Sequence, residues 1–292
     1  MNILTFDIEE WYLERIQHGG RTSKYLEYDE MFLKLLDLLD DSNIKATFFC
    51  VGELARLFPN VIREISNRGH EVGCHSNKHN WLNKMDSDML RIDTIEALKM
   101  LEDIAGQKVV SYRAPAFSIT QENKWAVNIL ADCGIENDCS IFPTNRDFGG
   151  FKDFPQDTPC IIRNKEAYLK EYPICLTNFF FKRMAYSGGG YFRLLPYWMI
   201  LKAMNNRDYN ICYFHLNDLV NQRFTFKSKA EYEEIYKETG TLKNRIIRYA
   251  KSNIGNGDSF GKMSRLLSEY LFVSVSEADK MIEWNKMNTV TL

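Results

Sequence analysis

Short apolar segments alternate with longer amphipathic ones along the first 140 residues of the chain. The apolar segments have the length of buried strands, and the amphipathic ones repeat their apolar residues at helical spacing. The pattern predicts strands at 2–6, 45–51, 70–73, 109–113 and 135–138, a late strand at 211–214, and helices at 31–39, 61–68, 85–105 and 123–133. Strands and helices that alternate so regularly predict an α/β fold, in which helices pack outside a parallel sheet.

The remainder of the chain has a less regular pattern. Between about 140 and 200, prolines and the run from Gly188 to Gly190 interrupt the apolar segments, which predicts long loops over one face of a barrel. After 221, charged amphipathic stretches at 229–237, 242–251 and 262–270 predict a helical C-terminal extension. We see no internal repeat or low-complexity linker, so we expect one domain over residues 1–292.

Composition and charge narrow the functional classes. The 292 residues are 45% hydrophobic and 26% charged, as in ordinary soluble proteins, and a net charge of −2 gives no electrostatic reason to expect nucleic-acid binding. The N-terminus lacks the features of a signal peptide, and no apolar run approaches the ~20 residues of a membrane span. The seven cysteines are odd in number and form no Cys-x-x-Cys pair, which argues against a disulfide framework or a structural zinc site. We therefore expect a cytoplasmic protein with reduced thiols and no transmembrane segment.

Two histidines four residues apart, His75 and His79, follow the predicted strand at 70–73. At this spacing both imidazoles can face one point, from a helical turn or from a tight loop. Neutral imidazole is a preferred zinc ligand, and catalytic zinc sites use three protein ligands. Such a pair also arises by chance. Its position at the carboxyl end of a strand, where barrel active sites assemble, is what favours a metal site.

Three carboxylates, Asp7, Glu9 and Glu10, follow the first predicted strand. Side chains alternate along a strand, so Asp7 and Glu9 point to the same side if the strand continues. One of them can then ligate a metal while the other acts as a general base. A solvated acidic loop that caps the next helix is an alternative, and a metal-independent glycosidase that uses Asp7 and Glu9 is another.

Arg113, Asp138 and His215 stand at the ends of later predicted strands. Arg113 can orient a carboxylate through a charge-assisted hydrogen bond, and His215 can act as a general acid. Each residue alone has a simpler explanation, such as a surface salt bridge, a helix cap or a core histidine. Their joint position at successive strand ends predicts one shared active site.

Together these motifs resemble those of the polysaccharide deacetylase family. In order they are Thr-Phe-Asp at 5–7, His-Ser-x-x-x-His at 75–79, Arg-x-Pro at 113–115, Asp-x-Ser at 138–140 and His-Leu at 215–216. The chain is most similar to the branch associated with bacterial exopolysaccharide and surface-glycan gene clusters, in which the first motif reads Asp-x-Glu and a segment like 188–196 recurs. The resemblance implies a distorted (β/α) barrel of about seven strands.

The resemblance also implies a set of catalytic roles. Asp7 is expected to be the base that activates water, and Arg113 to hold Asp7 in place. His215 is expected to protonate the leaving amine, and Asp138 to orient His215. The expected reaction removes an N-acetyl or N-formyl group from a nucleotide-, lipid- or oligosaccharide-linked amino sugar.

The same resemblance implies a metal site held by His75 and His79, with zinc expected and cobalt, nickel or iron as alternatives. Where many members have Asp-Asp, this chain has Asp7-Ile8-Glu9, so Glu9 is the expected third ligand and Glu10 the alternative. If neither reaches the metal, the protein is an inactive, carbohydrate-binding relative. Aromatic rings can stack on sugars, and the candidates are Trp11, Phe117 and Tyr191, together with Trp81 and Trp198.

Overall fold

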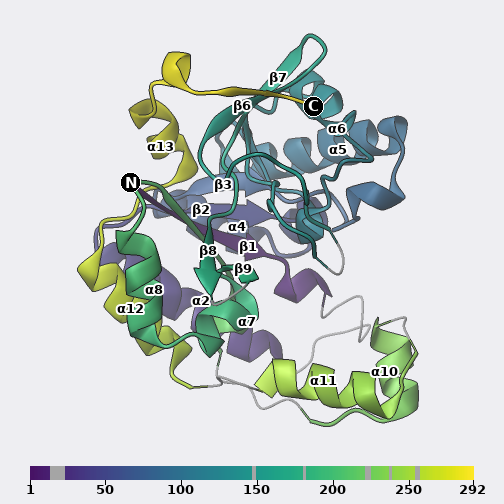
Figure 1. Cartoon of the computed structure of the whole chain (residues 1–292), viewed down its shortest axis with the longest axis vertical. Coiled ribbons are helices and arrows are strands. Elements are labelled where there is room, and N and C mark those ends of the chain that lie inside the picture. The colour runs from purple at the N-terminus through teal and green to yellow at the C-terminus, as the bar shows by residue number, and fades with distance from the viewer. Residues whose placement is uncertain (14–23, 147–148, 180–181, 221–224, 237–238, 254–256) are drawn as a thin grey trace.

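A nine-stranded, mostly parallel sheet forms the centre of the protein in a computed structural model (Figure 1). The structure describes residues 1–13, 24–146, 149–179, 182–220, 225–236, 239–253 and 257–292. The strands, in their order across the sheet, are β10 (Asn210–His215), β1 (Asn2–Ile8), β2 (Thr47–Cys50), β3 (Glu71–Cys74), β4 (Ser111–Tyr112), β5 (Asn137–Asp138), β7 (Ala167–Glu171), β6 (Cys160–Asn164) and β11 (Thr289–Thr291). The first seven strands in this order are parallel to one another, whereas β6 runs antiparallel to β7 and pairs in parallel with β11. The seven parallel strands confirm the expected fold, and the barrel is open between its two edges, β10 and β11.

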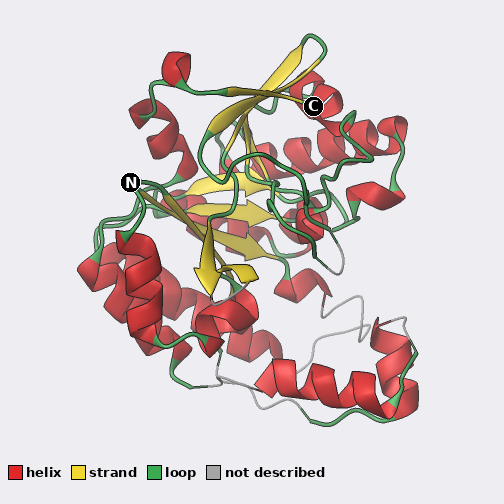
Figure 2. Ribbon diagram, viewed as in Figure 1, coloured by secondary structure: helices red, strands yellow, loops and turns green. Residues whose placement is uncertain are grey.

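Helices lie around the outside of this sheet (Figure 2). Their bounds are α2 (Lys24–Asp41), α3 (Gly52–Leu57), α4 (Pro59–Asn67), α5 (Ser87–Ala105), α6 (Ala126–Asp132), α7 (Gly189–Leu194), α8 (Tyr197–Asn205), α9 (Leu216–Leu219), α10 (Lys229–Tyr236), α11 (Leu242–Asn253), α12 (Ser259–Glu269) and α13 (Val275–Met281), with short 3₁₀ turns at Leu82–Lys84, Pro115–Phe117 and Trp284–Lys286. The four predicted helices of the first half correspond to α2, α4, α5 and α6. Within the described part of the chain, no helix combines the length and the apolar content needed to cross a bilayer.

The region from 140 to 200 contains more regular structure than predicted. Instead of long loops it holds the β6–β7 hairpin, a separate hairpin of β8 (Leu176–Phe179) and β9 (Lys182–Ala185), and helices α7 and α8. In β7 the buried Leu169 and Glu171 alternate with more exposed neighbours. The strands are only four or five residues long and mix charged with apolar side chains, so their two-residue period was too short to recognise.

The C-terminal part returns to the sheet after the predicted helices α10, α11 and α12. Helix α13 and strand β11 were not predicted. The backbone of Val273 accepts a hydrogen bond from Leu4 and donates one to Asn2, both at 3.0 Å. These bonds attach the C-terminal segment directly to β1.

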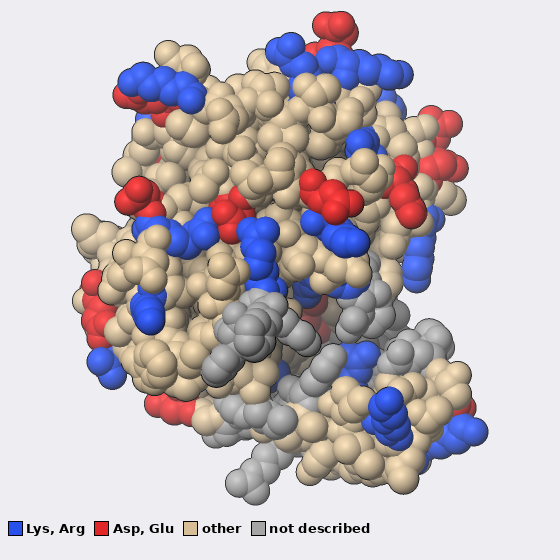
Figure 3. Space-filling view, in the orientation of Figure 1, with Lys and Arg blue, Asp and Glu red and all other residues tan. Residues whose placement is uncertain are grey.

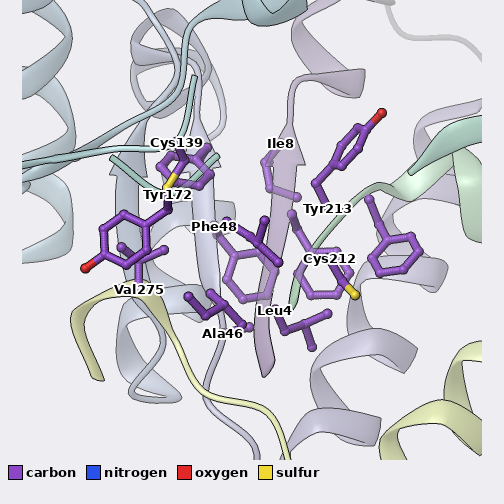
Figure 4. Close-up of a cluster of buried hydrophobic side chains, with 14 of the residues drawn as sticks. Leu4, Ile8, Ala46, Phe48, Cys139, Tyr172, Cys212, Tyr213 and Val275 are labelled. Carbon is purple, nitrogen blue, oxygen red and sulfur yellow. The ribbon is translucent and has the colours of Figure 1, made fainter. Parts of the chain in front are cut away.

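The core is centred on β1, in which Ile3, Leu4, Phe6 and Ile8 are completely buried. The ring of Phe6 stacks on Phe48 of β2, with 5.0 Å between the ring centroids. Figure 4 shows side chains from several strands, and Val275 of α13, in one continuous apolar cluster. A strand covered on both faces has a mostly apolar sequence, which is why β1 was detectable from the sequence.

Candidate active site

The polar residues at the predicted strand ends converge on the carboxyl edge of the sheet. Asp7 of β1 lies opposite His215 of β10, and the last residues of β3 and β4 pair with each other. Because these strands are parallel neighbours, the residues that follow them, among them Glu9, His75 and Arg113, meet at the same edge.

Glu9, His75 and His79 form a group that can hold a metal ion. One ligand atom from each residue lies within 4.8 Å of the others. Glu9 Oε2 is 2.5 Å from His79 Nε2 and 3.5 Å from His75 Nε2. Two imidazoles and one carboxylate, with room for water, are a ligand set that catalytic zinc sites use.

Backbone contacts direct both imidazoles toward Glu9. His75 directly follows β3, and its Nδ1 lies 2.7 Å from the carbonyl oxygen of Arg113. This contact places the ring proton on Nδ1 and leaves Nε2 to face Glu9 as a ligand atom. His79 adopts a left-handed conformation (φ 56°), and the loop before it is anchored by a hydrogen bond of 2.8 Å from the Asn77 N–H to Asp93 on α5.

The environment of Glu9 fits a bound cation. Its Oε2 is buried, and no described group donates a well-directed hydrogen bond to it despite the two nearby imidazoles. Burial raises the pKa of Glu9, but His79, His75 and His215 outweigh burial and hold that pKa well below its usual value. An ionised, buried carboxylate oxygen without a donor is costly unless a cation or another donor pairs with it.

Glu10, the alternative ligand, lies outside this group. Its Oε1 accepts a hydrogen bond of 3.0 Å from the Asn217 N–H, and its Oε2 accepts one of 3.3 Å from the Glu9 N–H. Burial raises the pKa of Glu10 to about 7. The side chain therefore ties the end of β1 to α9, and Glu9 is the carboxylate that faces the histidines.

Asp7 and Arg113 form a fully buried ion pair beside the metal-ligand group. Arg113 Nη1 lies 2.7 Å from Asp7 Oδ1 and also donates to Thr5 Oγ1 at 2.9 Å. The guanidinium carbon lies 4.3 Å from the centre of the Phe49 ring. A Cβ on Gly73 would come within 2.6 Å of that ring, so glycine is needed there for Phe49 to pack under Arg113. These contacts fix one oxygen of Asp7 and leave Oδ2 for the site.

His215 lies between the site carboxylates and Asp218. Its Nε2 is 3.8 Å from Asp7 Oδ2 and 3.7 Å from Glu9 Oε1, whereas its Nδ1 is 3.3 Å from Asp218 Oδ2. Burial lowers the pKa of His215, but the three carboxylates outweigh burial and hold it well above its usual value. A protonated imidazole in this position can donate a proton to a leaving group. Asp218, not Asp138, contacts the far nitrogen of His215, so the expected partner was wrong.

Two known family models match different parts of the chain. Residues 3–137 match the family model described as polysaccharide deacetylase. This part of the chain belongs to the polysaccharide deacetylase family. Residues 139–280 match a second model, DUF3473, a domain of unknown function. The deacetylase part contains Asp7 and the three metal-ligand candidates, whereas His215 comes from the second part.

Two Bacillus proteins are similar to part of this chain. A peptidoglycan-N-acetylglucosamine deacetylase of Bacillus cereus is 39% identical over 94 residues, which are 32% of this chain and 34% of that protein. YheN of Bacillus subtilis, described as a polysaccharide deacetylase, is 29% identical over 111 residues, 36% of this chain and 39% of that protein. The match thus spans between a third and two fifths of the length of these relatives.

One solved structure is similar over the whole deacetylase and DUF3473 regions. It comes from Mycobacterium smegmatis and is described as a polysaccharide deacetylase. The match covers 100% of this chain and 92% of that one, with a TM-score of 0.66 and 19% sequence identity. At this identity the comparison establishes the shared fold.

Asp138 supports the candidate active site from one layer further away. Its Oδ1 accepts a hydrogen bond of 2.5 Å from Ser140 Oγ, which itself accepts one of 2.8 Å from the N–H of Ala114, the residue after Arg113. Glu171 of β7 is fully buried against Asp138 and accepts a hydrogen bond from the Ile141 N–H at 3.1 Å. Burial raises the pKa of Asp138 to about 6 and, together with the Asp138 charge, raises the pKa of Glu171 well above its usual value. Glu171 therefore keeps a proton and donates it to Asp138.

Sequence reasoning missed both Glu171 and Asp218. Glu171 stands two residues after the buried Leu169, so it occupies a core position of β7, where an acidic residue is unusual. Asp218 stands three residues after His215, which is the spacing of a capping box at the start of α9. Both signals become informative only once the surrounding element is known.

The structure does not support sugar stacking by Trp11 or Phe117. Trp11 is 1% exposed, and its Nε1 donates a 2.9 Å hydrogen bond to Asp29. Phe117 is 4% exposed and packs edge-on against Tyr213. A buried ring presents no face to a ligand.

Three other aromatic candidates are accessible. Tyr191 and Trp81 are partly exposed. Trp198 is 62% exposed on α8, which Figure 1 shows on the opposite side of the molecule from the carboxyl end of β1. Tyr191 and Trp81 therefore stay candidates for substrate contact.

Proposed function

We propose that this chain is a metal-dependent hydrolase that removes N-acetyl or N-formyl groups from an amino sugar. The observation that carries the proposal is the constellation at the carboxyl edge. The Glu9–His75–His79 group lies next to Asp7, which is paired with Arg113, and next to His215, whose Nε2 is 3.8 Å from Asp7.

The residues of the site would divide the chemistry among them. A divalent metal held by Glu9, His75 and His79 would supply Lewis acidity that polarises the amide carbonyl and activates water. Asp7, with Oδ1 bound to Arg113, would accept the proton of the attacking water at Oδ2. His215, protonated and backed by Asp218, would then protonate the departing nitrogen. Asp7 has to accept a proton while His215 already carries one, so the two groups need different environments within one compact site.

Zinc is the first metal to test, because two imidazoles and one carboxylate suit it and leave an open position. Cobalt, nickel and iron accept the same ligands and are the alternatives. A metal-independent glycosidase built on Asp7 and Glu9 is disfavoured, since that mechanism gives no role to the His75 and His79 imidazoles that face Glu9.

The proposal extends to substrate and compartment. Similarity to the Bacillus cereus deacetylase supports a substrate that contains N-acetylglucosamine or a related amino sugar. We propose that it is nucleotide-, lipid- or oligosaccharide-linked and belongs to bacterial surface-glycan or exopolysaccharide metabolism. All seven cysteines are free thiols and six of them are buried, which supports action in the reducing cytoplasm.

The test is a metal-controlled acyl-release assay. The purified protein is loaded separately with Zn²⁺, Co²⁺, Ni²⁺ or Fe²⁺ and incubated with N-acetylated and N-formylated amino sugars of the three linkage types. Acetate or formate and free amine should appear in equal amounts, stop on chelation and return with metal. The Asp7→Asn variant should retain one equivalent of metal and lose the activity.

Two outcomes would oppose the proposal in different ways. Stoichiometric metal without release of acetate or formate from any of these substrates would indicate an inactive, carbohydrate-binding protein. Release of reducing sugar that survives chelation would indicate a glycosidase.

A further inference from the structure

Helix α11 exposes an apolar stripe. Leu242, Ile246 and Tyr249 recur at the spacing of one helix face and are 62%, 51% and 42% exposed. Phe226, itself 43% exposed, extends the stripe, with its ring centroid 5.6 Å from that of Tyr249. A contiguous apolar surface of this kind in a soluble protein marks an interaction site more often than a packing accident.

The charge of α11 is as distinctive as its apolar stripe. The helix contains four Lys or Arg residues and no Asp or Glu, which is a formal charge of +4 in 12 residues. The whole chain has a net charge of −2, so this helix is a positive element on a slightly negative protein. The acidic Glu231 and Glu233 of the neighbouring α10 bind the backbone N–H groups of Ser228 and Gly240 within the same unit.

Two of the basic residues stand at the borders of the stripe. At helical spacing, Lys243 falls on one side of it and Arg245 on the other. Arg245 is held there, because its guanidinium lies 4.5 Å from the centre of the Phe226 ring and its Nε donates to the carbonyl of Lys227 at 2.8 Å. Long basic side chains on both borders of an apolar stripe let the stripe enter an apolar phase while the charges stay at its boundary.

We propose that α11 docks on an anionic lipid surface and lies in the plane of the membrane interface. The stripe of Leu242, Ile246, Tyr249 and Phe226 would enter the boundary between headgroups and acyl chains, with Lys243 and Arg245 at the headgroups. Positive charge combined with an exposed apolar face is the pattern of interfacial helices, and it is complementary to acidic lipids.

The placement of α11 gives this docking a direction. Figure 1 shows α10 and α11 on the side of the molecule toward which β1 runs, and the site residues lie at the carboxyl ends of the strands. Figure 3, in the same orientation, shows this unit as a mainly tan surface with blue groups on it. A protein seated through α11 would hold its strand-end site toward the lipid side.

The test is co-sedimentation of the full-length protein with vesicles of phosphatidylcholine, alone or mixed with phosphatidylglycerol. Binding should require the anionic lipid and weaken as salt increases. Ile246→Glu should lower the partition coefficient by about tenfold or more, because it puts a charge in place of an exposed apolar group that would enter the lipid on docking. Lys243→Gln should lower it by about fivefold, the effect of one surface cation.

A matched control is Ile92→Glu on α5, since Ile92 is also apolar and 59% exposed. This variant should bind vesicles like the unmodified protein, and all variants should keep the same circular dichroism spectrum. Absence of binding to anionic vesicles, or equal loss in Ile92→Glu and Ile246→Glu, would overturn the proposal. Dimerisation in light scattering that Ile246→Glu abolishes, without vesicle binding, would assign the stripe to a second copy of the chain instead.

Discussion

The two halves of the chain that match different family models contribute different parts of the site. Residues 3–137 hold the candidate metal ligands just after β1 and on the loop after β3, with Asp7 and Arg113 beside them. Residues 139–280 contribute His215 at the end of β10, Asp218 on α9 and Glu171 on β7. One half can therefore bind the cation, while the other half sets the protonation state of the acid and supports Asp138. Metal binding and catalysis should be separable by mutation.

The largest effect should come from one histidine in each half. His79→Ala removes a ligand, so we expect metal affinity to fall by more than about 100-fold and activity to disappear with it. His215→Ala should keep the metal but lower the rate of acyl release by about 100- to 10,000-fold. Metal analysis and single-turnover rates measure the two effects. If His215→Ala also loses the metal, the division between the halves is wrong.

The next effect concerns the buried carboxyl pair. Glu171→Ala leaves Asp138 without its donor and the Ile141 N–H without its acceptor, so the free energy of unfolding should fall by about 3 kcal/mol. Glu171→Gln keeps a donor and should cost less than half of that.

The same pair should make the free energy of unfolding depend on pH. The folded-state pKa of Glu171 lies well above 4.5, so its contribution to stability is complete below about pH 4.5 and declines as the pH rises. Urea unfolding between pH 5 and 8 should show this decline in the unmodified protein and a flatter profile in Glu171→Gln. Equal profiles would mean that the pair does not share a proton.

A buried histidine in the first half should show the opposite slope. His70 is 1% exposed, accepts a hydrogen bond from the Ala46 N–H, and has its pKa lowered by burial from 6.5 to about 4. The unfolded chain binds this proton more tightly, so stability is complete above about pH 6.5 and falls by up to about 3 kcal/mol toward pH 4. His70→Gln should flatten the profile between pH 4 and 6.5, and an unchanged slope would contradict the assignment.

The smallest effects should come from two aromatic residues, Trp11 in the first half and Tyr191 in the second, which differ in whether they can contact substrate. Trp11→Phe removes the hydrogen bond to Asp29 and should cost about 1 kcal/mol of stability without changing KM. Tyr191→Ala should raise KM if this partly exposed ring contacts the sugar. A raised KM for Trp11→Phe at unchanged stability would indicate that Trp11 contacts the substrate after all.

Much of the first half could be predicted because its signals are local. The buried strands β1 and β2 have mostly apolar sequences, and parallel neighbours bring the residues after them to one edge. The convergence of His75, His79, Asp7 and Arg113 follows from that geometry, whereas their individual roles came from the resemblance to the polysaccharide deacetylase family.

The assignments that were wrong depended on contacts between distant segments. The role of Asp138 was mistaken because its partner Glu171 comes from a hairpin that periodicity did not reveal. The burial of Trp11 depends on Tyr28 and Phe32 of α2, which pack edge-on against it and cannot be inferred from its own position. The fold class and the location of the site thus follow from local patterns, and the ligand set follows from the family resemblance. The supporting contacts and the accessibility of side chains follow from packing.

Because β1 pairs with β10, the site can be completed only late in synthesis. Asn2 leaves the ribosome long before its partner Asn210, which is made after most of the sheet. The three candidate ligands all precede residue 80, so we expect a growing chain to be able to capture its cation long before the general acid has been translated. A polypeptide that stops short of β10 would bind metal without turning over substrate. Synthesis of β10 then adds His215, with which the bound metal can take part in catalysis.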